Sequence, residues 1–311
     1  MKVVSLFDGI SCARVALDRL GYKKVEYLAS EIDEAATRIS SRNWPDIVAL
    51  GDVKNVDGKK IRRGGSVDLL IGGSPCQDLS IAKKGRQGLK GSRSSLFYEY
   101  LRILKEIKPR YFVLENVASM SQESKDIISA EIGVKPILID AALVSAQSRK
   151  RLFWTNIPGV CQPWDRGIVL KDILESGFVD RDKSYAIVAS YGKKNARDYF
   201  LRRSGQMVYV KEATIKGFAI ARDGDSIDIS FPTSKTRRGR VGQKVKNIMT
   251  SPSIAVFTKG VIRKLTPIEC ERAFSLPDRY TEGESDAARY HALGNAFNVE
   301  VIAHILKHAD L

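Results

Sequence analysis

Residues 2–22 read KVVSLFDGISCARVALDRLGY, and this stretch decides the fold class. It opens with a short apolar, β-branched run of the kind that forms a buried strand. The Asp-Gly pair at 8–9 interrupts the run, and Ser11 is placed to cap a following helix. Apolar residues recur at helical spacing over 13–20, and Gly21 can end the helix. The stretch therefore predicts a strand, a turn and a helix, in that order.

The same order of elements repeats up to Trp154. Strand-like runs cover 25–31, 46–52, 67–73, 110–117 and 146–154, and helix-like runs cover 33–44 and 95–107. Alternating strands and helices predict a mostly parallel sheet with helices on both faces. We therefore expect an α/β fold whose ligands bind at the carboxyl ends of the strands.

The chain divides into three parts. After the first part, 1–154, short β-like pieces alternate with glycines, acids and basic clusters such as SKTRRGRVGQK at 234–244. We predict that 155–262 is a smaller, β-rich region. The last part, 263–311, contains two further helix candidates, at 266–276 and 298–309, and we expect it to pack back on the first.

The charge of the chain points to a polyanionic partner. The formal net charge of the 311 residues is +15. Residues 155–262 hold 19 Lys and Arg against 10 Asp and Glu, a balance of +9 in about a third of the length. Basic side chains that neutralise phosphates release condensed counterions, which favours binding to nucleic acid. A basic protein that is merely soluble is the alternative interpretation.

Composition also bears on location and metals. No run of about 18 apolar residues predicts a membrane span, and the first residues lack the layout of a signal peptide. The four cysteines, Cys12, Cys76, Cys161 and Cys270, form no C-x-x-C pair and adjoin no histidine cluster, so we expect no metal site. Without an export signal they are most simply reduced thiols, which indicates a cytoplasmic protein.

Acidic residues end three successive strand candidates: Asp8, Glu31 and Asp52. The turn at Asp8 can place backbone N–H groups against a ligand, and a carboxylate about twenty residues further on can hold ribose hydroxyls. The turn is not G-x-G-x-x-G, which argues against a pyrophosphate-binding dinucleotide site. Each acid alone is more simply a capping or solvated residue. Together they favour a nucleoside-containing ligand without pyrophosphate.

Cys76 follows the fourth strand candidate, within IGGSPCQDLS at 71–80. Glu115 closes the fifth strand, and Arg149 and Arg151 alternate along the next, which points them to the same side. A thiolate attacks an electron-poor ring carbon, nearby arginines lower the pKa of the thiol, and a carboxyl offsets charge on the ring. The alternatives are a buried apolar cysteine, a helix-end acid and a solvated basic edge.

Eight motifs, in order, resemble those of the C5-cytosine DNA methyltransferases. They are LFDG (6–9), SE (30–31), GDV (51–53), GGSPCQDLS (72–80), LENV (114–117), AQSRKRLFW (146–154), RKLTPIECER (263–272) and GNAF (294–297). The earlier motifs look particularly like those of the animal de novo enzymes, and RKLTPIECER looks like the bacterial and phage enzymes. The resemblance implies a Rossmann-like, S-adenosylmethionine-dependent methyltransferase fold, with a catalytic domain at 1–154 and a target-recognition region at 155–262.

The resemblance also implies roles for matching residues. Cys76 matches the nucleophile that adds to cytosine C6, and Glu115 matches the carboxyl that contacts N3. Arg149 and Arg151 match the arginines that orient the base and the active-site loop. Twelve residues match the cofactor pocket: Phe7, Asp8, Gly9 and Ile10 beside the methionine part, Glu31 at the ribose, Ile32, Asp52 and Val53 at the adenine, and Ser74, Leu96, Asn295 and Ala296.

The implied reaction is methyl transfer from S-adenosylmethionine, without a metal, to C5 of a cytosine that has left the stack of double-stranded DNA. One alternative is a tRNA cytosine C5 methyltransferase, because tRNA is also a polyanion. Another is a catalytically silent DNA-binding homologue that regulates a partner. The presence of all four catalytic residues argues against this alternative. A cognate restriction enzyme is a candidate partner, and the oligomeric state is left open.

Overall fold

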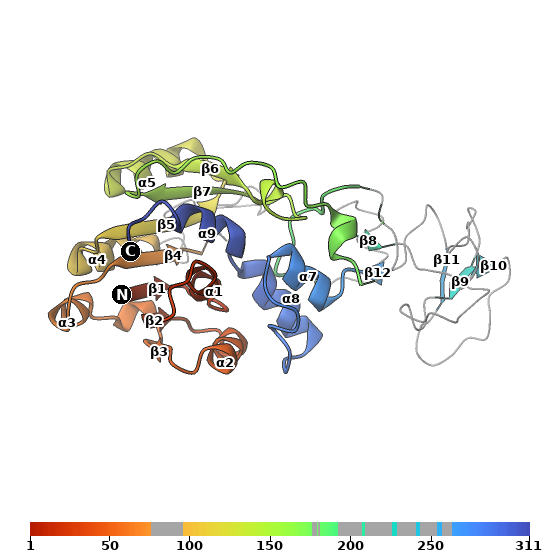
Figure 1. Ribbon diagram of the computed structural model, residues 1–311, viewed down its shortest axis with the longest axis horizontal. Helices are drawn as coiled ribbons and strands as arrows, with labels where there is room; N and C mark the ends of the chain where they lie inside the picture. Colours follow the sequence, from red (N-terminus) through yellow and green to blue (C-terminus); the bar gives the residue numbers. More distant parts are fainter. Residues whose placement is uncertain are drawn as a thin grey trace.

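The computed structural model describes residues 1–75, 96–175, 179, 181–191 and 265–311, together with the backbone of five short strands between 207 and 264. Cys76 lies outside these described residues. Seven strands form one sheet in the order β3-β2-β1-β4-β5-β7-β6 (Figure 1). They are β1 (Lys2–Leu6), β2 (Glu26–Ser30), β3 (Val48–Ala49), β4 (Leu69–Gly73), β5 (Tyr111–Val117), β6 (Ile137–Asp140) and β7 (Lys150–Thr155).

Neighbouring strands from β3 to β5 pair in parallel, whereas β7 runs antiparallel to both β5 and β6. The fold is therefore α/β with a mostly parallel sheet, as predicted. Because β1, β2, β3 and β4 share one direction, the loops that follow them meet at one edge of the sheet.

Helices cover both faces of the sheet (Figure 1). One face carries α1 (Cys12–Arg19), α2 (Glu34–Asn43) and α9 (Val299–Leu306), and the other carries α3 (Gly58–Arg63), α4 (Leu96–Ile107) and α5 (Gln122–Ile132). Buried side chains alternate between the faces as the period of a strand requires. In β4, Leu69 and Ile71 pack into the first core and Leu70 into the second.

The remaining described elements are short. They are the 3-10 helices η1 (Val53–Asn55), η3 (Ala141–Leu143) and η4 (Leu170–Ile173), the helices α7 (Pro267–Ala273) and α8 (Asp286–Asn295), and the strands β8 (Met207–Val208), β9 (Ser226–Asp228), β10 (Val241–Gly242), β11 (Ile254–Val256) and β12 (Arg263–Lys264). Strand β12 pairs with β8, and β9 pairs with β10 and β11. The predicted boundaries of the middle region stay predictions.

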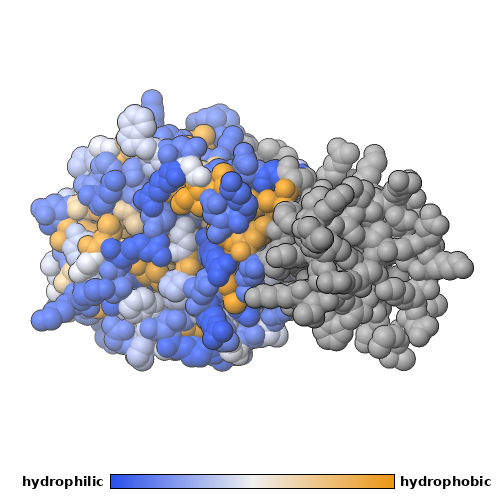
Figure 2. Space-filling view, turned by 45° about the vertical axis from the view of Figure 1, so that its right-hand side comes forward, coloured by the Kyte–Doolittle hydropathy of each residue, from blue (hydrophilic) through white to orange (hydrophobic). Residues whose placement is uncertain are grey.

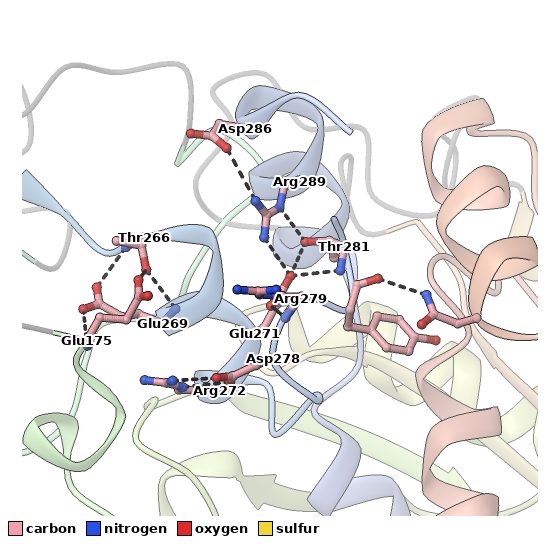
Figure 3. A network of polar contacts seen from close by, with 12 residues as sticks. Glu175, Thr266, Glu269, Glu271, Arg272, Asp278, Arg279, Thr281, Asp286 and Arg289 are labelled. Atoms are coloured by element: carbon pink, nitrogen blue, oxygen red, sulfur yellow. Dashed lines mark hydrogen bonds and ion pairs between the residues drawn. The ribbon is translucent and has the colours of Figure 1, made fainter. Parts of the chain in front are cut away.

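The chain leaves the described body after Tyr191 and re-enters it at Leu265, and these two residues touch. The backbone N–H of Leu265 donates to the Tyr191 hydroxyl at 3.0 Å. Beside them, the backbone N–H of Glu175 donates to the Glu269 carboxylate at 2.8 Å, within the polar network around α7 (Figure 3). The flanks of residues 192–264 are therefore held together in the body.

The strands predicted at 2–7, 25–31, 67–73 and 110–117 are confirmed as β1, β2, β4 and β5. The strand predicted at 46–52 is confirmed only over the two residues of β3. The prediction that Ser11 caps α1 is wrong. Ser11 precedes the helix in a left-handed conformation, with φ of 59°, and its side chain makes no capping hydrogen bond.

Among the described residues, no helix is long and apolar enough to cross a membrane. The part of the surface in colour in Figure 2 is mostly hydrophilic, with apolar residues gathered towards its middle. One of the apolar side chains exposed on the described part is Ile32, at 72% exposure. Its position next to β2 connects it to the candidate site.

Candidate active site

The loops after β1 and β2 are joined by one carboxylate. Glu31 Oε2 accepts the backbone N–H of Gly9 at 2.8 Å, and Oε1 accepts those of Ile32 and Asp33 at 2.7 and 2.8 Å. Three amides therefore fix the carboxylate, while Oε2, which accepts one of them, keeps a lone pair for a further donor. Gly9 and Glu31, which the sequence predicts to share a ligand, lie in contact.

The turn after β3 is fixed by its own acid and by a distant arginine. Asp52 Oδ1 accepts the backbone N–H of Lys54 at 3.0 Å, so this carboxylate caps η1. Arg102, on α4, donates to the carbonyls of Val53 and Val56 at 3.1 and 3.0 Å. The sequence does not reveal this role of Arg102, because nothing in a helical pattern shows which carbonyls a basic side chain will meet.

The ends of β4 and β5 form the second half of the site. Glu115 lies opposite Gly73 in the parallel register. A Cβ built on Gly73 would lie 2.8 Å from Phe297 Cε1 and 3.1 Å from Glu115 Oε2, so only glycine leaves room for both. Next to it, the Asn116 amide donates to the buried Ser74 hydroxyl at 3.0 Å. Cys76 follows Ser74 by two residues.

Glu115 forms an ion pair with Arg151, whose Nε lies 2.7 Å from Oε1. Both side chains are largely covered, at 13% and 18% exposure, so solvent screens this pair less than a surface pair. Glu115, Arg149, Arg151 and Phe297 line one small cavity. The structure thus pairs the predicted carboxyl with Arg151 and places Arg149 in the lining of the same cavity.

Arg149 precedes β7 and has a different environment from Arg151. Its buried guanidinium donates to the carbonyls of Ile187 at 3.0 Å, and of Gly294 and Ala296 at 3.1 Å each. The same group lies over the ring of Phe274. Arg149 therefore joins the start of β7 to the 181–191 segment and to the end of α8.

The other predicted residues surround these two halves. Phe7 has a left-handed φ of 56°, and Ile10 is fully buried. Leu96 is the first residue of α4. Asn295, exposed at the end of α8, lies 3.4 Å from His291 (Nδ2 to Nε2), and Ala296 is buried. Asp8 differs from the expectation, because its carboxyl points into the protein rather than towards the edge.

The cysteines within the described part of the chain are poorly suited to nucleophilic attack. Cys12 and Cys270 are buried, and burial together with the nearby Asp8 raises the pKa of the Cys12 thiol well above its usual range. Cys161 is exposed and does not line the cavity that contains Glu115. Within the described ranges, no group of three or more His, Cys, Asp or Glu side chains is placed to hold a metal ion.

The edge fits a nucleoside. Gly9 has φ of +61°, and a Cβ added there would meet nothing within 4 Å, so the first turn borders open space. The Glu31 carboxylate accepts the Gly9 amide beside that space, and the next residue, Ile32, has an exposed apolar side chain. A carboxylate for hydroxyls and an apolar face for a base are the groups that the adenosine part of S-adenosylmethionine requires.

This fold and this edge are those of a Rossmann-like methyltransferase. The model of the family described as C-5 cytosine-specific DNA methylase matches residues 1–310. The chain belongs to this family, which confirms the resemblance.

Curated relatives are similar over different shares of the chain. The orphan methyltransferases M.SPRI of Bacillus phage SPR and M.Rho11sI of Bacillus phage rho11s are 33% and 32% identical, over 57% and 68% of this chain. Those alignments span only 43% and 44% of the phage proteins. The type II methyltransferase M.HpaII of Haemophilus parainfluenzae is 27% identical over 96% of this chain and 86% of its own length.

Solved structures show the same fold. The Entamoeba histolytica methyltransferase EhMeth matches with a TM-score of 0.63 and 17% identity, over 99% of this chain and 97% of its own. The Dnmt2 methyltransferase of S. pombe matches with a TM-score of 0.62 and 15% identity, over the full length of both chains.

Proposed function

We propose that this protein transfers a methyl group from S-adenosylmethionine to C5 of cytosine in double-stranded DNA. Membership of the family over residues 1–310 supports the reaction class. The observation that carries the proposal is the pairing of Glu115 with Arg151 beside Gly73, three residues before Cys76. A carboxyl held by an arginine on the strand next to the one that leads to a cysteine is the arrangement that attack on a pyrimidine ring needs.

The cofactor would bind along the edge formed by the loops after β1, β2 and β3. Glu31 would accept the ribose hydroxyls, and Ile32 and Val53 would lie at the adenine. Arg102 supports this side, because it fixes the turn that begins at Val53. When bound, S-adenosylmethionine supplies an electrophilic methyl group.

In the proposed reaction the Cys76 thiolate adds to C6 of an extruded cytosine. Glu115 holds a proton at N3, which draws electron density from the ring and makes C5 nucleophilic once the C6–S bond has formed. C5 would then form its bond to the methyl group as the bond between that group and the sulfonium sulfur breaks, leaving S-adenosylhomocysteine. A base removes the C5 proton, and its electron pair restores the double bond as the C6–S bond breaks and returns the thiolate. Extrusion of the base costs about a few kcal/mol.

Competition between two substrates tests the proposal. The protein is incubated with S-adenosylmethionine carrying a labelled methyl group, a random-sequence duplex DNA library and a tRNA mixture. We expect 5-methyldeoxycytidine in the DNA, and sequencing of modified sites gives the recognition sequence. Label in tRNA alone would support the tRNA enzyme instead, and label in neither would support the silent homologue.

Matched cysteine variants control this experiment. Cys76→Ala should abolish methyl transfer, whereas Cys161→Ala should retain it, because Cys161 does not line the Glu115 cavity. Both variants remove one thiol. Equal activity of the two would contradict the role of Cys76.

A further inference from the structure

The turn between β1 and α1 has an unusual backbone. Phe7, Gly9 and Ser11 are all left-handed, with φ of 56°, 61° and 59°. Glycine adopts this conformation freely, but a residue with a Cβ does so only at a cost in free energy. Such residues persist where surrounding contacts hold them, often at functional sites. Ser11 therefore needs contacts that stabilise its left-handed backbone.

Ser11 is held by its side chain. It is fully buried, and its hydroxyl donates to Asp8 Oδ2 and contacts the hydroxyl of Ser40 on α2. Its backbone N–H donates to the carbonyl of Asp8 at 3.2 Å. Residues 8 and 11 are therefore joined through both backbone and side chain, which closes the turn around Gly9.

The Asp8 carboxyl is directed away from the cofactor edge. It is 5% exposed, and Oδ1 accepts the hydroxyl of Tyr27, on β2, at 2.7 Å. Within the described part of the chain its contacts are hydroxyl donors rather than an ion pair. Burial raises the pKa of this carboxyl. A buried carboxyl without a cation is costly unless it is hydrogen-bonded, so the hydroxyls of Ser11 and Tyr27 stabilise Asp8 in this position.

The consequence of the turn is the position of one amide. Gly9 lies between Asp8 and Ser11, and its N–H donates to Glu31 Oε2 at 2.8 Å. The Asp8 N–H donates to the Ser30 carbonyl at 3.1 Å, which joins the turn to the end of β2. If Ser11 left the left-handed region, Gly9 would turn and the Glu31 carboxylate would lose one of its three donors.

We propose that Asp8 and Ser11 are positioning residues for the cofactor. The buried Asp8 carboxyl anchors Ser11 in the left-handed conformation and so directs the Gly9 amide at Glu31. The identity of the ligand rests on the proposed function. Asp8 acts from behind the turn and need not touch the ligand.

Two substitutions at one position separate this role from a simple hydrogen bond. Ser11→Ala and Ser11→Gly remove the same hydroxyl, but only alanine retains a Cβ. If the conformation is what matters, the binding-competent turn becomes less populated in Ser11→Ala alone. Its Kd for S-adenosylhomocysteine should rise about tenfold, while that of Ser11→Gly stays within about threefold of wild type.

A rescue experiment keeps the test decisive if Ser11→Ala does not fold. Asp8→Asn should also weaken binding about tenfold, and adding Ser11→Gly should recover most of it, because glycine needs no anchor. Isothermal titration calorimetry with S-adenosylhomocysteine measures each Kd directly, and thermal denaturation checks folding. The variants should raise the KM for S-adenosylmethionine and leave kcat nearly unchanged.

The outcomes are distinct. Equal losses in Ser11→Ala and Ser11→Gly, or no rescue of Asp8→Asn by Ser11→Gly, would overturn the inference and leave the proposed function standing. Failure of the wild-type protein to bind S-adenosylhomocysteine would overturn the proposed function and this inference with it.

Discussion

Single residues at the strand ends set the geometry of the candidate site. Gly73 is the clearest case, because the space that a Cβ would need is filled by Phe297 and Glu115. Phe297 comes from the far end of the chain, so this glycine is where the first and last segments meet the carboxyl. Glycine here serves close approach rather than a turn.

Gly73→Ala should therefore displace Glu115. Since a shift of about 1 Å at a reacting group can cost about 100-fold in rate, we expect methyl transfer to fall by that order. Binding of S-adenosylhomocysteine should change much less, since Glu31 and Gly9 are untouched. Gly64→Ala is the matched control, because its Cβ would meet nothing closer than 3.4 Å. Steady-state rates of both variants check this, and equal losses would contradict it.

At the scale of elements, α2 is attached to the chain before α8 by one acid. Glu284 accepts two hydrogen bonds from Arg38 and one from Arg42, each at 2.9–3.1 Å. These arginines lower the pKa of Glu284 from 4.5 to about 2. A lowered pKa in the folded state means that the carboxylate stabilises the fold above pH 4.5 and loses this effect as the pH falls towards 2.

Glu284→Gln should thus lower the urea midpoint at pH 7, and the difference from wild type should shrink below pH 4.5. Glu34→Gln is the control, because Glu34 also pairs with Arg38 but is 91% exposed, where ion pairs contribute little. Urea titrations of the three proteins at about pH 7 and about pH 3.5 measure this. A difference that grows in acid would contradict the account.

The sequence predicted elements better than their contacts. Strands β1, β2, β4 and β5 were evident from apolar runs, because each is buried on both faces. The antiparallel insertion of β7 between β5 and β6 was not, since a four-residue run such as 137–140 carries no information on direction. The positions of Glu31 and Glu115 could be predicted as well, because the apolar runs mark where strands β2 and β5 end. The inward turn of Asp8 was missed, because its partner Tyr27 lies on another strand.

At the scale of the whole molecule, the described residues on either side of 192–264 meet each other in the body. Tyr191 touches Leu265, and the Tyr290 hydroxyl donates to the Leu265 carbonyl at 2.7 Å. Around them, Glu271 is fully buried and accepts from Arg289 and from the backbone of Thr281 (Figure 3). The two flanks of residues 192–264 are therefore joined by hydrogen bonds within the described body.

The basic character of that segment predicts a salt dependence. Replacing Arg237, Arg238 and Arg240 with glutamine should weaken DNA binding and reduce the slope of log K against log salt by about 0.9 for each phosphate that is no longer neutralised. Lys59, Lys60 and Arg62 on α3 are the control, because the same charge is removed near the amino end of β4. Fluorescence anisotropy at several salt concentrations measures both slopes. Equal reductions would assign DNA binding to net charge alone.

The central claim is covalent attack by Cys76 on cytosine in DNA, and one measurement tests it most directly. A random-sequence duplex in which 5-fluorocytosine replaces cytosine is incubated with the protein and S-adenosylmethionine. Because C5 then has no proton to lose, the C6–S bond cannot break after methyl transfer. We predict a denaturation-resistant complex whose cross-linked peptide contains Cys76 and which Cys76→Ser does not form. No complex with the wild-type protein, or attachment through Cys12, Cys161 or Cys270, would contradict the account.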